Sequence, residues 1–211
     1  MGFGILFFGY MMLFSVPYKG IDFPPLILAY LLILIALTKM GKYIRKVRFA
    51  SYFSGALLAL SAVKLSYQIA VLFTAIPETV MNVITVTEIV LTLPFYFFML
   101  IGFAELAEQV ELPKLAGKCK RNFGIVCLFY AFTIFFTLYN YGVIPYINGV
   151  SVGGAMAIQQ VLGYIMRFMN LFLIASCYRL ICLEGDEDMP YTPNKFEAFM
   201  TKLVKGDRKD K

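Results

Sequence analysis

The chain has 211 residues, of which 60% are hydrophobic and only 15% are charged. A soluble domain carries about 25% charged and about 45–50% apolar residues, so this composition excludes that class and indicates an integral membrane protein. The chain contains no histidine. Zinc hydrolases, histidine-assisted serine or cysteine nucleophiles and haem sites with a histidine ligand are therefore excluded.

Six apolar runs follow one another along the chain. A spanning helix needs about 20 residues, and six spans with short loops use almost the whole sequence. The predicted spans are residues 2–16, 26–38, 50–76, 83–103, 123–141 and 155–183. The first barely reaches the required length. The expected fold is all-α: one polytopic membrane domain, residues 1–183, that forms a bundle of six transmembrane helices.

Basic residues between the spans predict the orientation of this bundle. Loops on the cytoplasmic side carry an excess of lysine and arginine. The loop after the second span contains Lys39, Lys42, Arg45, Lys46 and Arg48, and the loop after the fourth contains Lys114, Lys118, Lys120 and Arg121. We therefore expect both termini in the cytoplasm and the protein in the plasma membrane.

Residues 184–211 are expected to form a cytoplasmic tail. A short amphipathic helix is predicted at about 194–205, after the capping pair Thr192-Pro193. Such a helix suits the anionic inner leaflet of a bilayer, although a protein partner could bind the same face. The residues expected to contact the membrane surface are Lys42, Arg45, Lys46, Arg48, Lys195, Lys202 and Lys205. The acidic cluster at 184–188 lacks the ligand spacing of a calcium loop, so we expect no metal site and no cofactor.

Polar residues inside the last four spans recur at helical spacing, so each of these helices carries one polar face. Because lipid cannot satisfy hydrogen bonds, the four faces are expected to meet in a polar core, with the first two spans at the periphery. The candidates for this core, or for contact with a substrate, are Lys64, Gln68, Glu88, Asn140, Gln160, Arg167 and Asn170.

The charges of this core leave two interpretations open. Lys64 and Glu88 are expected to lie close enough to pair, which leaves Arg167 without an obvious acidic partner. In one interpretation Arg167 is satisfied by neighbouring amides and backbone carbonyls, or Glu88 bridges both cations. In the other, the core is a hydrated cavity of net charge +1, suited to an anionic substrate or a lipid headgroup.

Two functions from different classes remain. The first is a small transporter or permease-like protein that uses the polar core. The second is an accessory or scaffold subunit of a larger membrane complex, without transport activity of its own. Expected partners are the lipid bilayer and a second copy or another membrane protein, with no nucleic acid. We expect no catalytic residues, although an intramembrane lipid-modifying enzyme using Glu88 stays open.

Overall fold

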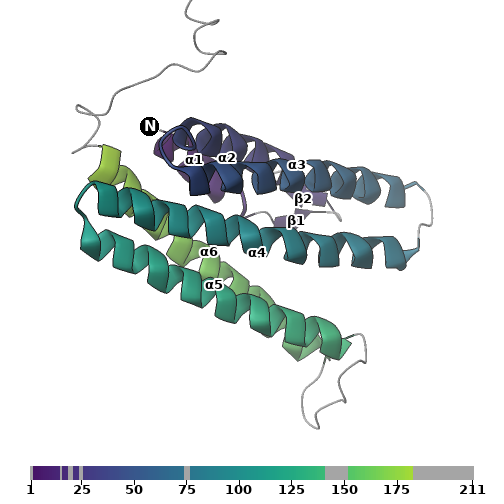
Figure 1. Cartoon of the computed structure of the whole chain (residues 1–211). Helices are drawn as coiled ribbons and strands as arrows, with labels where there is room; N and C mark the ends of the chain where they lie inside the picture. The colour runs from purple at the N-terminus through teal and green to yellow at the C-terminus, as the bar shows by residue number, and fades with distance from the viewer. Residues whose placement is uncertain are drawn as a thin grey trace, which may run out of the picture.

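The computed structural model describes residues 2–14, 16–18, 21–23, 26–73, 77–140 and 152–182. Figure 1 shows that the described residues form a helical bundle with one small β-hairpin. The helices are α1 (Phe3–Met11), α2 (Leu26–Met40), α3 (Arg45–Val71), α4 (Glu78–Gln109), α5 (Pro113–Asn140) and α6 (Val152–Cys177), which continues into the π-helical turn η1 (Tyr178–Cys182). The hairpin pairs β1 (Val16–Tyr18) antiparallel with β2 (Ile21–Phe23).

Four of the helices, α3 to α6, are long and apolar enough to cross a membrane. Helices α1 and α2 have 9 and 15 residues, which corresponds to lengths of about 14 Å and about 22 Å against a hydrocarbon layer of about 30 Å. The helical membrane bundle is therefore found, but six full spans are not. The first two predicted spans are instead two short helices joined through a hairpin.

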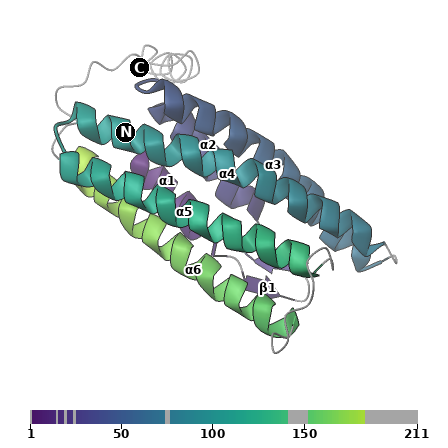
Figure 2. The ribbon, with the colours of Figure 1, turned by 60° about the horizontal axis from the view of Figure 1, so that its bottom comes forward.

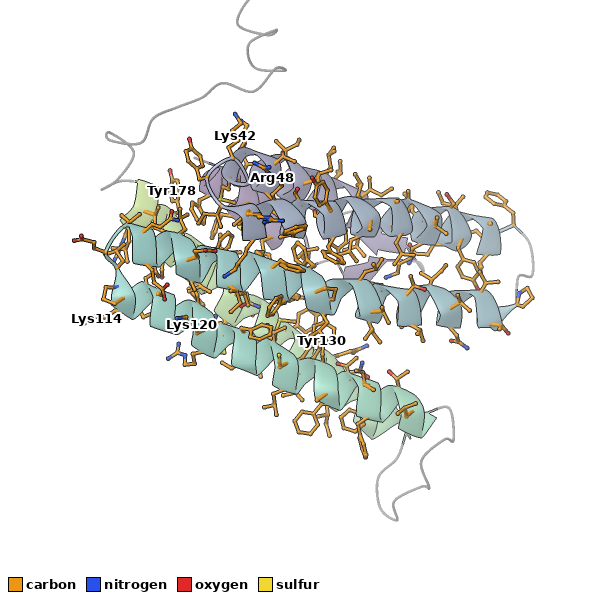
Figure 3. The ribbon with its side chains drawn as sticks, in the orientation of Figure 1. Lys42, Arg48, Lys114, Lys120, Tyr130 and Tyr178 are labelled. Carbon is orange, nitrogen blue, oxygen red and sulfur yellow. The ribbon has the colours of Figure 1, made fainter. Side chains whose placement is uncertain are left out.

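The N-terminus, the α2–α3 turn, the α4–α5 turn and η1 all lie at one end of the bundle (Figure 1). A Cβ atom added to Gly4 would lie 3.7 Å from the ring of Tyr178, which places the start of α1 beside η1. Figure 3 shows Lys42, Arg48, Lys114 and Lys120 gathered there. We call this the basic end, and its described basic residues are Lys39, Lys42, Arg45, Lys46, Arg48, Lys114, Lys118, Lys120, Arg121 and Arg179.

The expected peripheral position of the first two spans is wrong for α1, which lies inside the bundle (Figure 2). Its side chains Phe3, Leu6 and Tyr10 are all 0% exposed. Glycine is the physical reason, because a Cβ atom on Gly2 would lie 2.6 Å from the carbonyl oxygen of Ala36. Only the absence of a side chain allows the backbones to approach so closely.

A second close approach between the backbones of α1 and α2 occurs two turns further along, at Gly9. A Cβ atom on Gly9 would lie 2.9 Å from the Cβ atom of Leu32 and 3.1 Å from the carbonyl oxygen of Ala29. Gly2 and Gly9 are seven residues apart, and so are Ala29 and Ala36 of α2 that face them, so the small residues form one matching face on each of the two antiparallel helices. Sequence reasoning that looks only for polar stripes overlooks this face.

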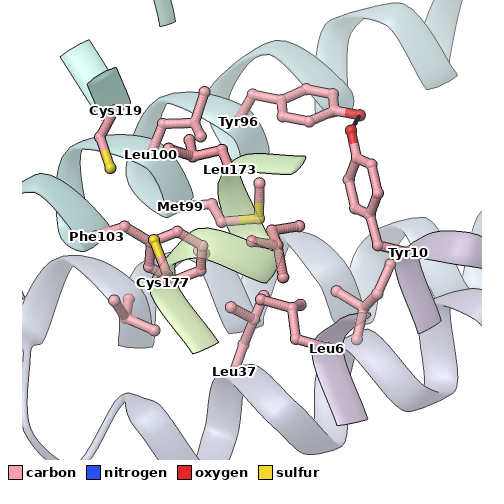
Figure 4. Packing of buried hydrophobic residues seen from close by; sticks show 14 of the residues in the cluster. Leu6, Tyr10, Leu37, Tyr96, Met99, Leu100, Phe103, Cys119, Leu173 and Cys177 are labelled. Carbon is pink, nitrogen blue, oxygen red and sulfur yellow. Dashed lines mark hydrogen bonds between the residues drawn. The ribbon is translucent and has the colours of Figure 1, made fainter. Parts of the chain in front are cut away.

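The side of the bundle toward the basic end is filled by apolar side chains. Figure 4 shows them packed between α1, α2, α4, α5 and α6. The labelled members are Leu6, Leu37, Met99, Leu100, Phe103, Leu173, Cys119 and Cys177, and all are buried. Tyr10 and Tyr96 meet at the edge of this apolar layer.

Candidate functional site

An ion pair joins α3 to α4 inside the bundle. The ammonium nitrogen Nζ of Lys64 lies 3.7 Å from Oε2 of Glu88, and the two side chains are 17% and 31% exposed. Lys64 extends the buried face of α3, since it follows Leu57 and Ser61 at helical spacing. By helical rise, the Lys64 backbone lies about 10 Å from the far end of α3 and about 28 Å from its start.

The ion pair lies at the level where α2 begins. Leu26, the first residue of α2, lines the same small cavity as Lys64 and Glu88. Beyond this level α3 continues for about 10 Å without α2 beside it, and β2 also contacts α3. The interior layer of the protein is thus interrupted beside a pair of intramembrane charges.

A cavity of about 10 Å³ adjoins the ion pair, which is the size that holds one water molecule. Apolar side chains and the polar groups of Tyr30, Ser61, Lys64 and Glu88 form its walls. The hydroxyl of Ser61 donates to the carbonyl oxygen of Leu58 at 2.8 Å. The cavity can hydrate the ion pair but has no room for an organic solute in this conformation.

Arg167 lies near the middle of α6 and binds the end of α1. Its Nη1 donates a hydrogen bond of 3.0 Å to the carbonyl oxygen of Leu13, the second residue after the helix. The C-terminal end of a helix carries partial negative charge from its unpaired carbonyls, so a cation is stabilised there. Of the two interpretations of Arg167, the contact with a backbone carbonyl is the one that the structure contains.

Asn170, one turn further along α6, links α6 to α5. The Nδ2 of Asn122 lies 3.3 Å from Oδ1 of Asn170 and 3.2 Å from the carbonyl oxygen of Met169. Asn170 in turn donates to the sulfur of Met166 at 3.2 Å. Both asparagines are buried, at 3% and 1% exposure. Sequence reasoning missed Asn122, because it lies close to the basic loop and outside the predicted limits of the fifth span.

Four tyrosines complete the interior polar groups, and sequence reasoning missed all of them. The hydroxyls of Tyr10 and Tyr96 are 2.8 Å apart and buried (Figure 4). Tyr30 lines the cavity at the ion pair, and Tyr130 is buried halfway along α5 (Figure 3). Tyrosine counts as apolar on a helical wheel, so its hydroxyl gives no signal there.

The remaining candidates of the polar core have different positions. Gln68 is partly buried one turn beyond Lys64. Gln160 is exposed, so its expected place in the core is wrong. Asn140 ends α5, and its side chain lies outside the described residues. Thr85, Thr92 and Thr137 donate hydrogen bonds to carbonyl oxygens of their own helices, as in the 2.6 Å hydrogen bond from Thr92 to the carbonyl oxygen of Glu88.

Of the residues predicted to contact the membrane surface, four lie in the described part of the chain and three do not. Arg45, Lys46 and Arg48 are exposed at the basic end, and Lys42 is partly buried there. Lys46 pairs with Glu105 at 3.4 Å, and Arg45 stacks 5.6 Å above the ring of Phe49. The predicted tail helix, with Lys195, Lys202 and Lys205, lies outside the described residues.

Comparison with protein-family models, with curated proteins and with solved structures finds no match for this chain. The class of the protein therefore follows from its own sequence and fold. Four long apolar helices and predominantly apolar outer surfaces define a membrane-embedded helical bundle. Its distinguishing features are an intramembrane ion pair and an arginine held at the end of a short interior helix.

Proposed function

We propose that the protein is a small transporter or permease-like protein of the plasma membrane, with its basic end in the cytoplasm. The observation that carries this proposal is the position of Lys64 and Glu88 beside the interruption between α1 and α2. Secondary transporters commonly place solute and coupling-ion sites where helices are interrupted near the middle of the bilayer. Ionisable residues at that depth are costly and mark substrate or ion pathways.

The position of Arg167 at the end of α1 supports the same proposal. The short helix α1 ends at Arg167, and α2 begins at the ion pair. The end of α1 and the start of α2, which carry opposite dipole charges, thus each lie beside a charged side chain, and helix ends inside a membrane are places where transporters bind ions. In this proposal the structure is a closed form, because the cavity at the ion pair, of about 10 Å³, is no larger than one water molecule. Glu88 has no catalytic role.

The proposal is tested by transport currents in proteoliposomes on a solid support, with a panel of amino acids, organic acids and inorganic phosphate. The wild-type protein should give a solute-dependent current that Lys64→Leu, Glu88→Gln and Arg167→Leu abolish. Lys118→Leu, at the exposed basic end, is the matched control and should keep the current. Currents that the three interior variants leave unchanged would exclude these residues from transport.

A second candidate is an accessory subunit of a larger membrane complex, and the size of the cavity favours it. A protein without transport of its own needs no space for a solute, and the cavity at Lys64 and Glu88 has none. The exposed basic end then offers a surface for acidic partners. Affinity purification in mild detergent decides this case, and a protein that always purifies alone or as copies of itself counts against it.

A further inference from the structure

The guanidinium group of Arg167 has unused hydrogen-bonding capacity. Arginine carries five N–H donors, and within the described residues the only acceptor bonded to Arg167 is the carbonyl oxygen of Leu13. The side-chain ion pairs there join other groups, namely Lys46 with Glu105, Lys64 with Glu88 and Lys120 with Glu108. Arg167 is therefore a cation in the middle of α6 that pairs with none of the carboxylates whose side chains the structure describes.

The other guanidinium nitrogens of Arg167 are not completely buried. Among the described residues, the one buried side-chain polar atom without a partner is the hydroxyl oxygen of Thr133, not a nitrogen of Arg167. The side chain as a whole is only partly buried. The guanidinium group thus keeps some exposed surface while it is bonded to Leu13.

Aromatic rings flank this partly exposed cation. The guanidinium carbon lies 6.0 Å from the ring centre of Tyr164. Phe14, at the end of α1, packs against Tyr164 and Phe168 of α6, with ring centres 6.4 Å and 4.7 Å apart. Tyr164 and Phe168 are 38% and 50% exposed. A charged group and an apolar aromatic surface therefore lie side by side where α1 meets α6.

We propose that Arg167, Phe14, Tyr164 and Phe168 form a binding site for a small aromatic carboxylate. The carboxylate accepts two hydrogen bonds from free N–H groups of Arg167, since a guanidinium fork matches the two oxygens of a carboxylate. The aromatic body of the ligand packs against Phe14 and Phe168. This inference deepens the proposed function, on which it rests for its meaning, by assigning the chemical class of the solute.

The test measures binding of radiolabelled benzoate to the full-length protein in nanodiscs of phosphatidylcholine. We expect saturable binding that unlabelled benzoate displaces and that benzylamine, which has the same ring and the opposite charge, does not. Arg167→Gln should weaken binding about tenfold or more. Arg121→Gln, which removes an exposed arginine from the basic end, is the matched control and should bind as the wild type does.

Two further arms keep the test decisive if Arg167→Gln fails to fold. Arg167→Lys keeps the charge and loses the fork, and Phe168→Leu removes the ring, so both should weaken benzoate binding in a protein that elutes as the wild type does on size exclusion. No saturable binding, equal displacement by benzylamine, or displacement by phosphatidylglycerol would overturn the proposal. Benzoate binding without transport currents would reject the proposed function alone, and currents with other solutes but no benzoate binding would reject this inference alone.

Discussion

Lys64 of α3 and Glu88 of α4 form an ion pair inside the bundle, with 3.7 Å between Nζ and Oε2. Both side chains are less than one third exposed, at 17% and 31%. Each charge stabilises the other where neither is fully hydrated, so the two residues act as a unit. The contribution of each residue can be separated from that of the pair only by comparing the two single variants with the double variant.

The first prediction concerns this unit. Lys64→Leu and Glu88→Gln should each lower the stability of the protein, because each removes the 3.7 Å contact between opposite charges and leaves the other charge in a partly buried position. The double variant should be more stable than the sum of the single changes implies, with a coupling energy on the order of 1–3 kcal/mol. Reversible unfolding in mixed micelles measures these energies. Additive effects of the two substitutions would mean that the ion pair contributes nothing.

The second prediction concerns the hydroxyls of Tyr10 and Tyr96, which are 2.8 Å apart in the interior. Tyr10→Phe or Tyr96→Phe removes one hydroxyl and leaves the other buried without this partner, at a cost on the order of 1 kcal/mol. The double phenylalanine variant should cost less than the two single variants combined. Tyr52→Phe is the control, since Tyr52 is 65% exposed and should show no change. Reversible unfolding in mixed micelles measures the loss of stability. Equal effects of the substitutions at Tyr10, Tyr96 and Tyr52 would contradict this prediction.

The third prediction concerns the close approach of α1 and α2. Gly9→Ala places a methyl group 2.9 Å from the Cβ atom of Leu32 and 3.0 Å from the backbone nitrogen of Ile33. The backbone cannot give way without separating the helices, so the substitution should cost about 1–3 kcal/mol. Gly124→Ala is the matched control, because no atom lies within 4 Å of the added Cβ. There the substitution should stabilise the helix slightly. A neutral Gly9→Ala would show that the two helices are less tightly packed than described.

The fourth prediction concerns orientation. In a variant whose native cysteines are replaced by serine or alanine, we introduce Thr79→Cys at the start of α4 and, separately, Lys118→Cys near the start of α5. Both positions are exposed. A maleimide that cannot cross membranes should label Thr79→Cys in intact cells and Lys118→Cys only after permeabilisation, because the basic end is expected in the cytoplasm. The opposite labelling pattern would reverse the proposed orientation.

Much of this fold could be predicted from the sequence, because composition and hydrophobic length report directly on the bilayer. The four long helices correspond to the last four predicted spans. The limits of the helices were less predictable. α5 begins at Pro113 rather than at 123, since a helix can continue beyond the apolar run through charged residues such as Lys118 and Lys120. Hydropathy marks the part of a helix in lipid and not its ends.

The first forty residues were misread for a different reason. An apolar stretch of fifteen residues satisfies the same pattern whether it crosses the membrane or ends inside it, and only its neighbours decide. Gly2 and Gly9 allow α1 to pack inside against α2, and Arg167 satisfies its end. These contacts join residues far apart in the sequence, so no local pattern contains them.

The candidate site was only partly predictable. The sequence shows which residues are charged, but it does not show where the hydroxyl groups of tyrosines lie in the fold. Lys64, Glu88, Arg167 and Asn170 are interior polar groups, as their scarcity in apolar spans indicates. Their assignment as site residues stays a prediction. The tyrosines were invisible because a buried tyrosine and a lipid-facing one have the same place in a hydropathy count.

The bond between Arg167 and Leu13 sets an order of events during synthesis. Its two residues are separated by 154 positions, so at a translation rate of about 5–20 residues per second the acceptor waits roughly 8–30 s for its donor. A carbonyl group without a partner in hydrocarbon costs several kcal/mol. The hydrogen bond at the end of α1 can therefore form only after Arg167 has been synthesised, so a residue made late satisfies a carbonyl group made early.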